Sequence, residues 1–364
     1  MKVYAYPADE WGCGHYRVSW PAQAVSIDSS WDVTIVEPGA RAVDVEVDLK
    51  GRVVAERFPA DADVIVLQRP TSPFVQQAVP LLARRCAVVI DMDDDLAHIH
   101  PRNPAFNAMS GRGFYRHPVT GQPVPNLHSW KHAAQACRDA TLVTVTTRAL
   151  AKRYGRAGAV RVIPNMVPAQ YLDLPREDSA VVGWGGSVHS HPDDLQQVGG
   201  AVASLVRSGV AFSTVGDPEG VSRALGLSDD DWDAVGPVTM GEWPRAIARF
   251  GVGVAPLADT VFNQAKSRLK PLEYAAVGVI PVVSGVEDYR LFAKQGGCII
   301  ADRPRSWESA IRPLVADPAR RADMSGAVRE VAAMNTFEAN AFRWADAWQE
   351  AVDLQRREVP AGAA

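Results

Sequence analysis

Residues 262–284, FNQAKSRLKPLEYAAVGVIPVVS, contain the most informative pattern in the chain. Its pattern predicts a short helix with Lys266, Ser267 and Lys270 around its start and Gly278 at its end. A buried strand is predicted at residues 280–283. Amides in the first turn of a helix have no partner inside the helix, and the helix dipole adds partial positive charge there. This helix start is therefore predicted to bind an anion, most naturally a phosphate or diphosphate.

Length and composition limit the class of protein. A chain of 364 residues predicts two domains, each large enough for its own core. The net charge of −4 argues against nucleic-acid binding as the main function, because the chain lacks a global basic field. Four scattered cysteines without a C-x-x-C pair indicate neither a zinc site nor a disulfide framework. With no signal peptide and no long apolar run, we expect a cytoplasmic protein without a membrane span.

Short apolar runs alternate with amphipathic ones along the whole chain, which predicts an α/β protein with two Rossmann-like, doubly wound halves. A polar connector at residues 168–177 separates the halves, and a hairpin turn is expected at residues 48–51. Residues 99–127 show little periodicity and are predicted to form an irregular loop that recognises an acceptor. The predicted strands are residues 2–6, 31–36, 63–67, 86–91, 142–146 and 160–164, then 180–184, 212–215, 235–238, 251–256, 280–283 and 298–301.

Several motifs occur in an order that resembles one enzyme family. They are TRALAKRY (147–154), VRVIPNMVP (160–168), VVGWGGSVHSHPDDL (181–195), VGPV (235–238) and the run 252–284. Together they resemble the retaining nucleotide-sugar glycosyltransferases of the GT-B fold, in the glycogen-synthase-like group 1 family and a bacterial or phage-type subfamily. The resemblance implies an acceptor-side domain at 1–175 and a nucleotide-sugar-binding domain at 176–335. It also implies that an aromatic helix at 336–355 crosses back to the first domain.

The resemblance implies that a sugar passes from a nucleotide-diphosphate donor, most of all a UDP-sugar, to a hydroxyl acceptor, with retention and without a metal or other cofactor. Lys266 and Lys270 would neutralise the leaving diphosphate as catalytic residues. The alternative for both is a solvated helix end, although two lysines at a helix start oppose its dipole unless an anion compensates them. Glu273 would bind the ribose. In the family an earlier glutamate usually contacts the sugar, but this chain has Ala265 there, so that contact is not carried over.

Further donor-binding positions follow from the same resemblance. Ser267 and Leu269 belong to the helix start, and Val238, with the backbone near Gly236, would meet the base. Two glycine loops, at Gly14 after the first strand and at Gly186-Ser187 in the second half, would approach the donor phosphates, although a G-x-G pattern alone is weak. The family often places an arginine and a lysine in the second of these loops, and this chain has neither there.

The acceptor side is predicted from Arg17, Arg69, His98 and His189. For His189 and its neighbour His191, an ordinary loop histidine is an equally weighted alternative. Asp93 and Asp94 belong to the acidic run Asp91-Met-Asp-Asp-Asp95, and we interpret them as catalytic or hydrogen-bonding groups for an acceptor hydroxyl. A helix cap is the competing interpretation. Single-domain transferases bind a metal with a D-x-D motif, but the resemblance is to enzymes that do not, so no metal site is predicted.

Other functions remain open on sequence grounds. A sugar-nucleotide epimerase and a non-catalytic sugar-nucleotide-binding or nucleic-acid-binding module fit the same architecture. The acceptor of a transferase could be a glycan, a lipid, a protein hydroxyl or a hydroxymethylated DNA base. A DNA acceptor would require a basic groove, with ordinary surface charge as the alternative explanation of the candidate residues, which are Arg84, Arg85, Arg102, Arg112, Arg116 and Lys131. The sequence leaves the sugar, the base and the oligomeric state open.

Overall fold

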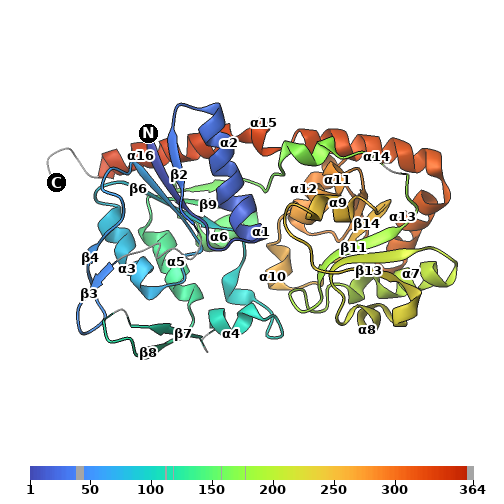
Figure 1. The fold of residues 1–364 in the computed structure, drawn as a ribbon, viewed down its shortest axis with the longest axis horizontal. Helices are drawn as coiled ribbons and strands as arrows, with labels where there is room; N and C mark the ends of the chain where they lie inside the picture. Colours follow the sequence, from blue (N-terminus) through green and yellow to red (C-terminus); the bar gives the residue numbers. More distant parts are fainter. Residues whose placement is uncertain (38–44, 111–112, 118, 157, 177, 359–364) are drawn as a thin grey trace. The chain divides into compact units, whose positions relative to one another are not determined.

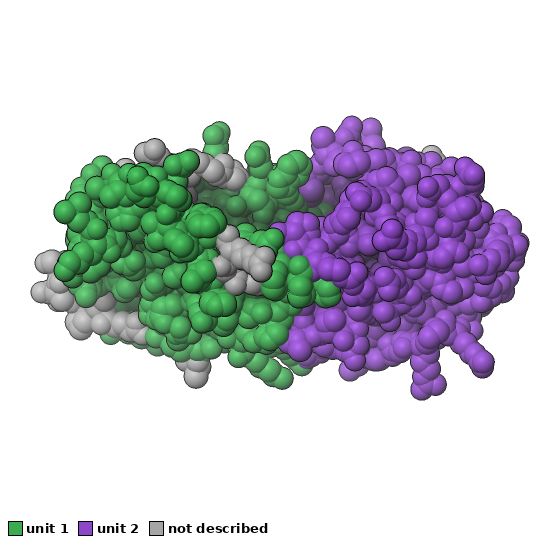
Figure 2. Space-filling view, turned by 90° about the horizontal axis from the view of Figure 1, so that it is seen from below, with its two compact units in different colours: residues 1–101, 105–165, 340–364 green, residues 102–104, 166–339 purple. Residues whose placement is uncertain are grey.

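The computed structural model describes residues 1–37, 45–110, 113–117, 119–156, 158–176 and 178–358. The chain forms two compact units, coloured separately in Figure 2. The first unit contains Met1–Pro101, Ala105–Asn165 and the C-terminal segment from Asn340. The second unit contains Met166–Ala339 together with the short piece Arg102–Pro104. Within the described part of the chain, no helix combines the length and apolar character needed to cross a membrane.

The first unit is built on a six-stranded sheet in the order β10-β9-β6-β5-β1-β2, and its strand pairs are parallel. Every residue of β5 and β6 is buried, as expected for parallel strands whose two faces are both covered. The predicted hairpin turn is confirmed between β3 (Val45–Val47) and β4 (Val53–Glu56). The strands of the large sheet are β1 (Lys2–Tyr6), β2 (Asp32–Ile35), β5 (Val64–Gln68), β6 (Ala87–Met92), β9 (Leu142–Val145) and β10 (Val160–Val162).

Helices of the first unit come from both ends of the chain. In Figure 1, the last helix, α16 (Phe342–Glu358), runs beside α2 (Trp20–Asp28) and β6. Trp344 and Trp348 of α16 are each only 2% exposed, so this helix is part of the core of the first unit. The other α-helices are α1 (Gly12–Gly14), α3 (Pro73–Leu82), α4 (Ala105–Ser110), α5 (Trp130–Asp139) and α6 (Arg148–Tyr154).

The second unit repeats the plan with a parallel six-stranded sheet in the order β13-β12-β11-β14-β15-β16. Its core includes Trp184 of β11 and Trp307 of α13. The strands are β11 (Val182–Ser187), β12 (Phe212–Asp217), β13 (Asp233–Val235), β14 (Val252–Ala255), β15 (Ile280–Val283) and β16 (Ile299–Ile300). The helices are α7 (Gln196–Arg207), α8 (Val221–Leu225), α9 (Trp243–Ile247), α10 (Val261–Gln264), α11 (Leu269–Ala276), α12 (Glu287–Lys294), α13 (Pro304–Ala316), α14 (Pro318–Ala333) and α15 (Phe337–Asn340).

Three local predictions were wrong. Residues 99–127 were expected to be irregular, but they contain α4 and an antiparallel pair, β7 (Gly113–Arg116) with β8 (Pro123–Asn126). Tyr115 of β7 packs edge-on against Phe74, with ring centroids 4.9 Å apart, so a distant aromatic partner holds the pair in place. The expected glycine loop at residues 11–17 is helical from Gly12 onward and continues through a π-helical turn, His15–Ser19. The strand expected at residues 235–238 ends at Val235.

Candidate functional site

The start of α11 in the second unit brings the predicted anion-binding residues together. The helix begins at Leu269, so Lys270 lies in its first turn, and Lys266 and Ser267 lie just before it. The preceding Arg268 is buried and donates from its backbone N–H and guanidinium to Asp288, at 2.7 and 2.6 Å. Because Arg268 is neutralised internally, Lys266 and Lys270 are the cations of this helix start.

Lys270 connects α11 to the end of β11. Its Nζ donates to the carbonyl oxygen of Gly185 and lies 5.5 Å from the centre of the Trp184 ring. A Cβ on Gly186 would stand 2.9 Å from that Nζ, so only glycine permits this approach without displacing the lysine. Burial lowers the pKa of Lys270 to about 8, against the opposing effects of Glu273 and Asp194. The lysine predicted from sequence therefore lies against the glycine loop predicted from sequence.

The remaining donor-side residues surround this contact. Glu273 lies one helical turn after Leu269 and is 6% exposed, while Lys266 Nζ is 4.4 Å from the centre of the Phe262 ring. Ala265 is buried at 5% exposure, so the position where the resemblance places a sugar-binding acid is occupied by an apolar contact. Ser267 and Leu269 are half-buried beside Lys270.

Asp194 is a site residue that sequence reasoning missed. Its carboxylate is 2% exposed and accepts hydrogen bonds from the Ala258 N–H at 2.8 Å and from Asn263 Nδ2 at 2.6 Å. Its other oxygen lies 3.2 Å from His191 Nδ1. Nothing in the local sequence HPDDL distinguishes Asp194 from Asp193, because two of its partners lie 64 and 69 residues further along the chain.

Two predicted residues of the second unit have their own partners on the neighbouring strand and loop. Ser187 Oγ donates to Asp217 Oδ2 at 3.1 Å, which joins the ends of β11 and β12. His189 Nε2 lies 3.2 Å from Glu219, and both side chains are largely exposed. Val238 lies in the loop after β13 and is half-buried.

In the first unit, three charged residues meet at the carboxyl ends of β1, β5 and β6. Arg69 follows β5 in the left-handed region, with φ of 45°, and its guanidinium pairs with Asp9. Arg69 Nε also lies 3.4 Å from Asp93 Oδ1, and neither of these buried atoms has a hydrogen-bond partner among the described residues. Burial raises the pKa of Asp93, although Arg69 opposes the shift. A cavity of about 460 Å³ beside this cluster is lined by residues that include Tyr6, Asp9, Gln68, Arg69, Ser72 and Met109.

Gly14 shapes the same edge of the first unit. Its N–H donates to Asp9 Oδ1 at 3.0 Å, and a Cβ at this position would come within 1.8 Å of the Asp9 carbonyl oxygen. A side chain here would force the Asp9 backbone to move, so the glycine is required by packing. The observed contact of this glycine is with a neighbouring loop of its own unit, and its approach to the donor phosphates stays a prediction.

Arg17 was predicted to lie on the acceptor side, and the structure contradicts this prediction. It is 2% exposed, and its guanidinium donates twice to Asp91, at 3.0 and 2.8 Å, and also to Ile163 O and Asn165 Oδ1. A guanidinium committed to four internal bonds is not available to an acceptor. The reason is electrostatic: Asp91 is buried in the middle of the sheet and needs a counter-charge. Tyr16 is likewise buried and packs against Trp20, 4.7 Å between centroids.

The acidic run separates into residues with different surroundings. Asp91 pairs with Arg17, and Asp95 lies 3.0 Å from both His98 Nδ1 and the Arg153 guanidinium. Nδ1 of His98 is thus engaged with Asp95, the His98 side chain is 38% exposed, and its acceptor-side role stays a prediction. Asp93 is close to Arg69, and Asp94 is half-buried beside it. No group of three or more potential metal ligands is found among the residues that the structure describes.

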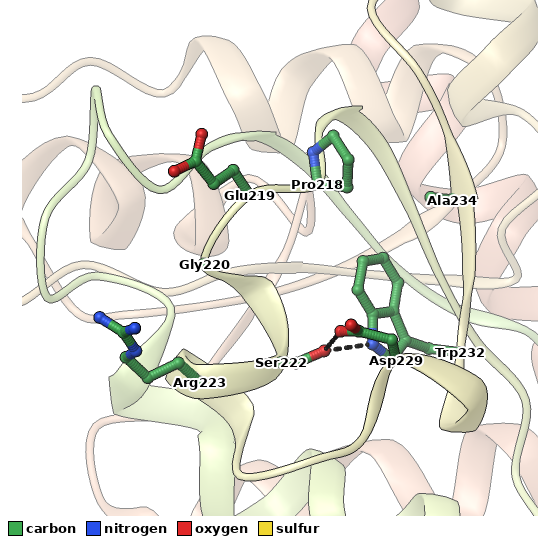
Figure 3. A pocket seen from close by; sticks show the side chains of 8 residues that line it. All are labelled: Pro218, Glu219, Gly220, Ser222, Arg223, Asp229, Trp232 and Ala234. Carbon is green, nitrogen blue, oxygen red and sulfur yellow. Dashed lines mark hydrogen bonds between the residues drawn. The ribbon is translucent and has the colours of Figure 1, made fainter.

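A second hollow, of about 590 Å³, lies on the second unit around the loop after β12 (Figure 3). Trp232 Nε1 donates to Ser222 Oγ at 2.9 Å, and that hydroxyl in turn donates to Asp229, so one wall is hydrogen-bonded internally. Arg223 and Glu219 provide the charged part of its lining. None of the donor-binding or catalytic residues predicted from sequence lines this hollow.

Comparison with known proteins finds no matching family model and no matching curated protein. Solved structures do match. HepE from Anabaena in complex with UDP is 14% identical, with a TM-score of 0.61 over 96% of this chain and 99% of HepE. An alpha-glucosyltransferase in complex with UDP and a 13-mer DNA containing an HMU base is also 14% identical, with a TM-score of 0.62 and the same two coverages.

The chain has the GT-B fold. This confirms the predicted α/β class with two Rossmann-like sheets. TarM is a further match, 13% identical with a TM-score of 0.53. That alignment covers 78% of this chain and 54% of TarM, so this chain spans about half of the TarM length. At these identities the likeness establishes the GT-B architecture, and the function is argued from the site itself.

Proposed function

We propose that the protein is a glycosyltransferase that moves a sugar from a nucleotide-diphosphate donor, a UDP-sugar, to a hydroxyl acceptor. One observation carries the proposal: Lys270 in the first turn of α11 lies against Gly185 and Gly186 at the end of β11, with Lys266 just before the helix. A helix start, a side-chain cation and a glycine loop at the carboxyl end of a parallel strand form a site suited to a diphosphate. UDP in the HepE and alpha-glucosyltransferase structures supports this choice of donor.

In this proposal the second unit binds and activates the donor. Lys266 and Lys270 stabilise the charge that develops on the nucleoside diphosphate as the bond to the sugar breaks. Glu273 accepts hydrogen bonds from the ribose hydroxyls, which compensate the burial of its carboxylate. Gly186, Ser187 and Leu269 allow close approach to the phosphates, and the backbone near Val238 meets the base. Retention of configuration and independence from metal are parts of the same proposal.

The first unit is proposed to hold the acceptor in the cavity beside Asp9, Arg69 and Asp93. Asp93 Oδ1 is a buried oxygen without a hydrogen bond among the described residues, and an acceptor hydroxyl would provide the missing donor. Because burial raises the pKa of Asp93, the carboxylate is also a stronger base than an exposed aspartate. We therefore assign Asp93 the contact with the acceptor hydroxyl, with Asp94 next to it.

A hydroxymethylated DNA base is the second candidate acceptor, because the alpha-glucosyltransferase structure contains DNA with an HMU base. This alternative has less support, because some of the residues that could form a basic groove are neutralised by acidic partners. Arg85 pairs with Glu56 at 2.6 Å, and Arg102 pairs with Asp193. Arg112, another candidate, lies outside the described residues. Two of the six candidate residues are therefore engaged in ion pairs, whereas Arg84, Arg116 and Lys131 are exposed.

The test of the transferase assignment is the release of nucleoside diphosphate from a panel of UDP-, GDP-, ADP- and dTDP-sugars, with and without EDTA. Lys270→Ala is expected to reduce release about 100-fold to 1,000-fold, the cost of losing one group that stabilises the leaving charge. Lys294→Ala, which removes an exposed lysine of α12 in the same unit, is the matched control and should keep the wild-type rate. Wild-type activity in Lys270→Ala would contradict the assignment.

Product analysis and metal dependence separate the rival functions. An epimerase would convert the donor into an isomeric sugar nucleotide without releasing nucleoside diphosphate, and a binding module would do neither. Release that persists in EDTA agrees with a metal-independent transferase. Strict dependence on Mn²⁺ would overturn the proposal of metal independence. The acidic run at residues 91–95 would then be the candidate metal site.

A further inference from the structure

The loop that follows β11, residues 187–194, contains His191 close to the proposed diphosphate site. Its sequence, SVHSHPDD, has no arginine or lysine, although the family that the chain resembles often places both there. The positive charge at this end of the sheet therefore comes from Lys266 and Lys270 on the opposite side of the site. The loop contains two imidazoles, those of His189 and His191, and an imidazole can become cationic near neutral pH.

The position of the His191 ring is set by contacts on several sides. Nδ1 lies 3.2 Å from Asp194 Oδ2, and the His191 N–H donates to Ser187 O at 3.1 Å. Asp194 is held in turn by the Ala258 N–H and by Asn263 Nδ2. A buried carboxylate facing Nδ1 keeps the proton on that nitrogen and directs Nε2 away from it. No hydrogen-bond partner for Nε2 is found among the described residues.

The charges facing His191 determine its protonation. Burial lowers its pKa, Asp194 opposes that shift, and Lys266 and Lys270 both reinforce it. Lys270 in turn faces Glu273 and Asp194. Without a ligand, burial first and the two lysines second therefore disfavour a positively charged imidazole. A bound diphosphate would act against this shift, because its negative charges offset the lysines and favour imidazolium.

We propose that His191, oriented by Asp194, is a third cationic contact of the nucleoside diphosphate and takes up a proton when the nucleotide binds. The proposal rests on the proposed transferase function and extends it with a residue in a loop that lacks arginine and lysine. The proton comes from the solvent, and Nε2–H donates to a phosphate oxygen. His191 makes and breaks no covalent bond, and Asp194 is a positioning residue that acts through it.

The decisive measurement is the number of protons exchanged when nucleotide binds. Calorimetric titration at pH 7.0 in two buffers with different ionisation enthalpies gives this number for UDP, GDP, ADP and dTDP. At this pH Lys270, with a pKa of about 8, is already about nine-tenths protonated, so it contributes little to the uptake. Ionisation of the nucleotide itself is common to all variants and cancels when the wild type is compared with a variant.

The expected result is a larger proton uptake by the wild type than by His191→Gln, by at least half a proton per nucleotide bound. His191→Gln should also bind nucleotide about tenfold more weakly at pH 7.0, the scale of one charge-assisted hydrogen bond. His189→Gln is the matched control from the same loop. Its ring contacts Glu219 and not the lysines, so the uptake should persist in that variant.

Asp194→Asn tests the positioning role with almost no change in shape. The amide oxygen can still accept from Ala258 and Asn263, but the charge that favours imidazolium is gone, so the proton uptake should fall toward that of His191→Gln. A purely structural role would leave the uptake unchanged in every variant that keeps the wild-type thermal unfolding midpoint.

The outcomes distinguish this inference from the function on which it rests. Nucleotide binding with equal proton uptake in the wild type and folded His191→Gln overturns the role of His191 and leaves the transferase proposal intact. If the wild type binds none of the four nucleotides, both proposals fail. Uptake lost equally in His191→Gln and His189→Gln would assign it to the loop as a whole and also overturn the inference.

Discussion

At the scale of single residues, Lys270 lies in the first turn of α11 and contacts both the Gly185 carbonyl oxygen and the Trp184 ring. Burial lowers its pKa to about 8, so its positive charge is present below pH 8 and is lost as the pH rises above that value. We predict that kcat/KM for the donor falls about tenfold for each pH unit above about 8. The measurement is a pH profile of nucleoside diphosphate release.

Lys270→Arg is the control for this profile, because a guanidinium stays protonated to above pH 12. Whatever its absolute rate, this variant should lose the decline between pH 8 and pH 10. A wild-type profile that is flat to pH 10, or a decline that persists unchanged in Lys270→Arg, would contradict the assignment of the titration to Lys270.

Arg17 and Asp91 provide a prediction about stability in the first unit. Their side chains are 1% and 2% exposed, so Asp91→Asn leaves a guanidinium buried without its counter-charge. We expect a loss of about 3–5 kcal/mol in the free energy of unfolding. Asp61→Asn, which removes a partner of the exposed pair Lys2–Asp61, should cost much less, because solvent screens this pair. Urea denaturation followed by circular dichroism measures both, and equal losses would show that burial does not decide the effect.

At the scale of elements, α7 contains two adjacent glycines with different surroundings. A Cβ on Gly199 would lie 2.7 Å from the Ala224 carbonyl oxygen, whereas a Cβ on Gly200 would meet nothing within 4 Å. Both substitutions gain the same helix propensity, about 1 kcal/mol for alanine over glycine. Gly200→Ala should therefore stabilise the second unit by about 0.5–1 kcal/mol.

Gly199→Ala should instead destabilise the second unit by about 1–2 kcal/mol, because the close contact with α8 costs more than the propensity gains. The free energies of unfolding of the two variants, measured side by side, test the packing of α7 on α8. If Gly199→Ala is as stable as Gly200→Ala, that packing is looser than the structure indicates.

At the scale of the whole molecule, the C-terminal segment from Asn340 belongs to the first unit, and α16 lies within that segment. Trp344 packs there with its ring centre 5.9 Å from the Arg17 guanidinium, and Trp348 lies 6.1 Å from Trp31. Trp344→Ala is expected to cost about 3–5 kcal/mol in the free energy of unfolding, because it removes a large buried aromatic side chain.

Phe342, in the same helix, is 51% exposed and offers a control aromatic truncation. Phe342→Ala should change the free energy of unfolding by no more than about 0.5–1 kcal/mol. If the two truncations had the same effect, α16 would contribute through helix propensity alone and not through its tryptophans. Chemical denaturation with circular dichroism detection distinguishes these results without depending on tryptophan fluorescence.

The repeated α/β plan and the position of the helix start at Lys270 could both be predicted from local sequence patterns. Buried parallel strands are continuous apolar runs, and β5, β6 and β15 are visible as such without any tertiary contact. The helix start at Lys270 is a local pattern of lysines, proline and glycine, so it too can be predicted from a short segment. The β7 and β8 segments were missed because strand propensity depends on context, and Tyr115 of β7 packs against Phe74, about forty residues earlier.

The surroundings of each polar residue became visible only from contacts between distant parts of the chain. Arg17 and Arg69 both follow strands and look equivalent in sequence. The Arg17 guanidinium donates hydrogen bonds to Asp91, Ile163 and Asn165. Arg69, in contrast, lines a cavity. Asp194 could not be predicted from the sequence, because the groups that donate hydrogen bonds to it come from distant parts of the chain. Strand and helix patterns are local, but the cost of burying a charge is set by whichever residues the fold brings next to it.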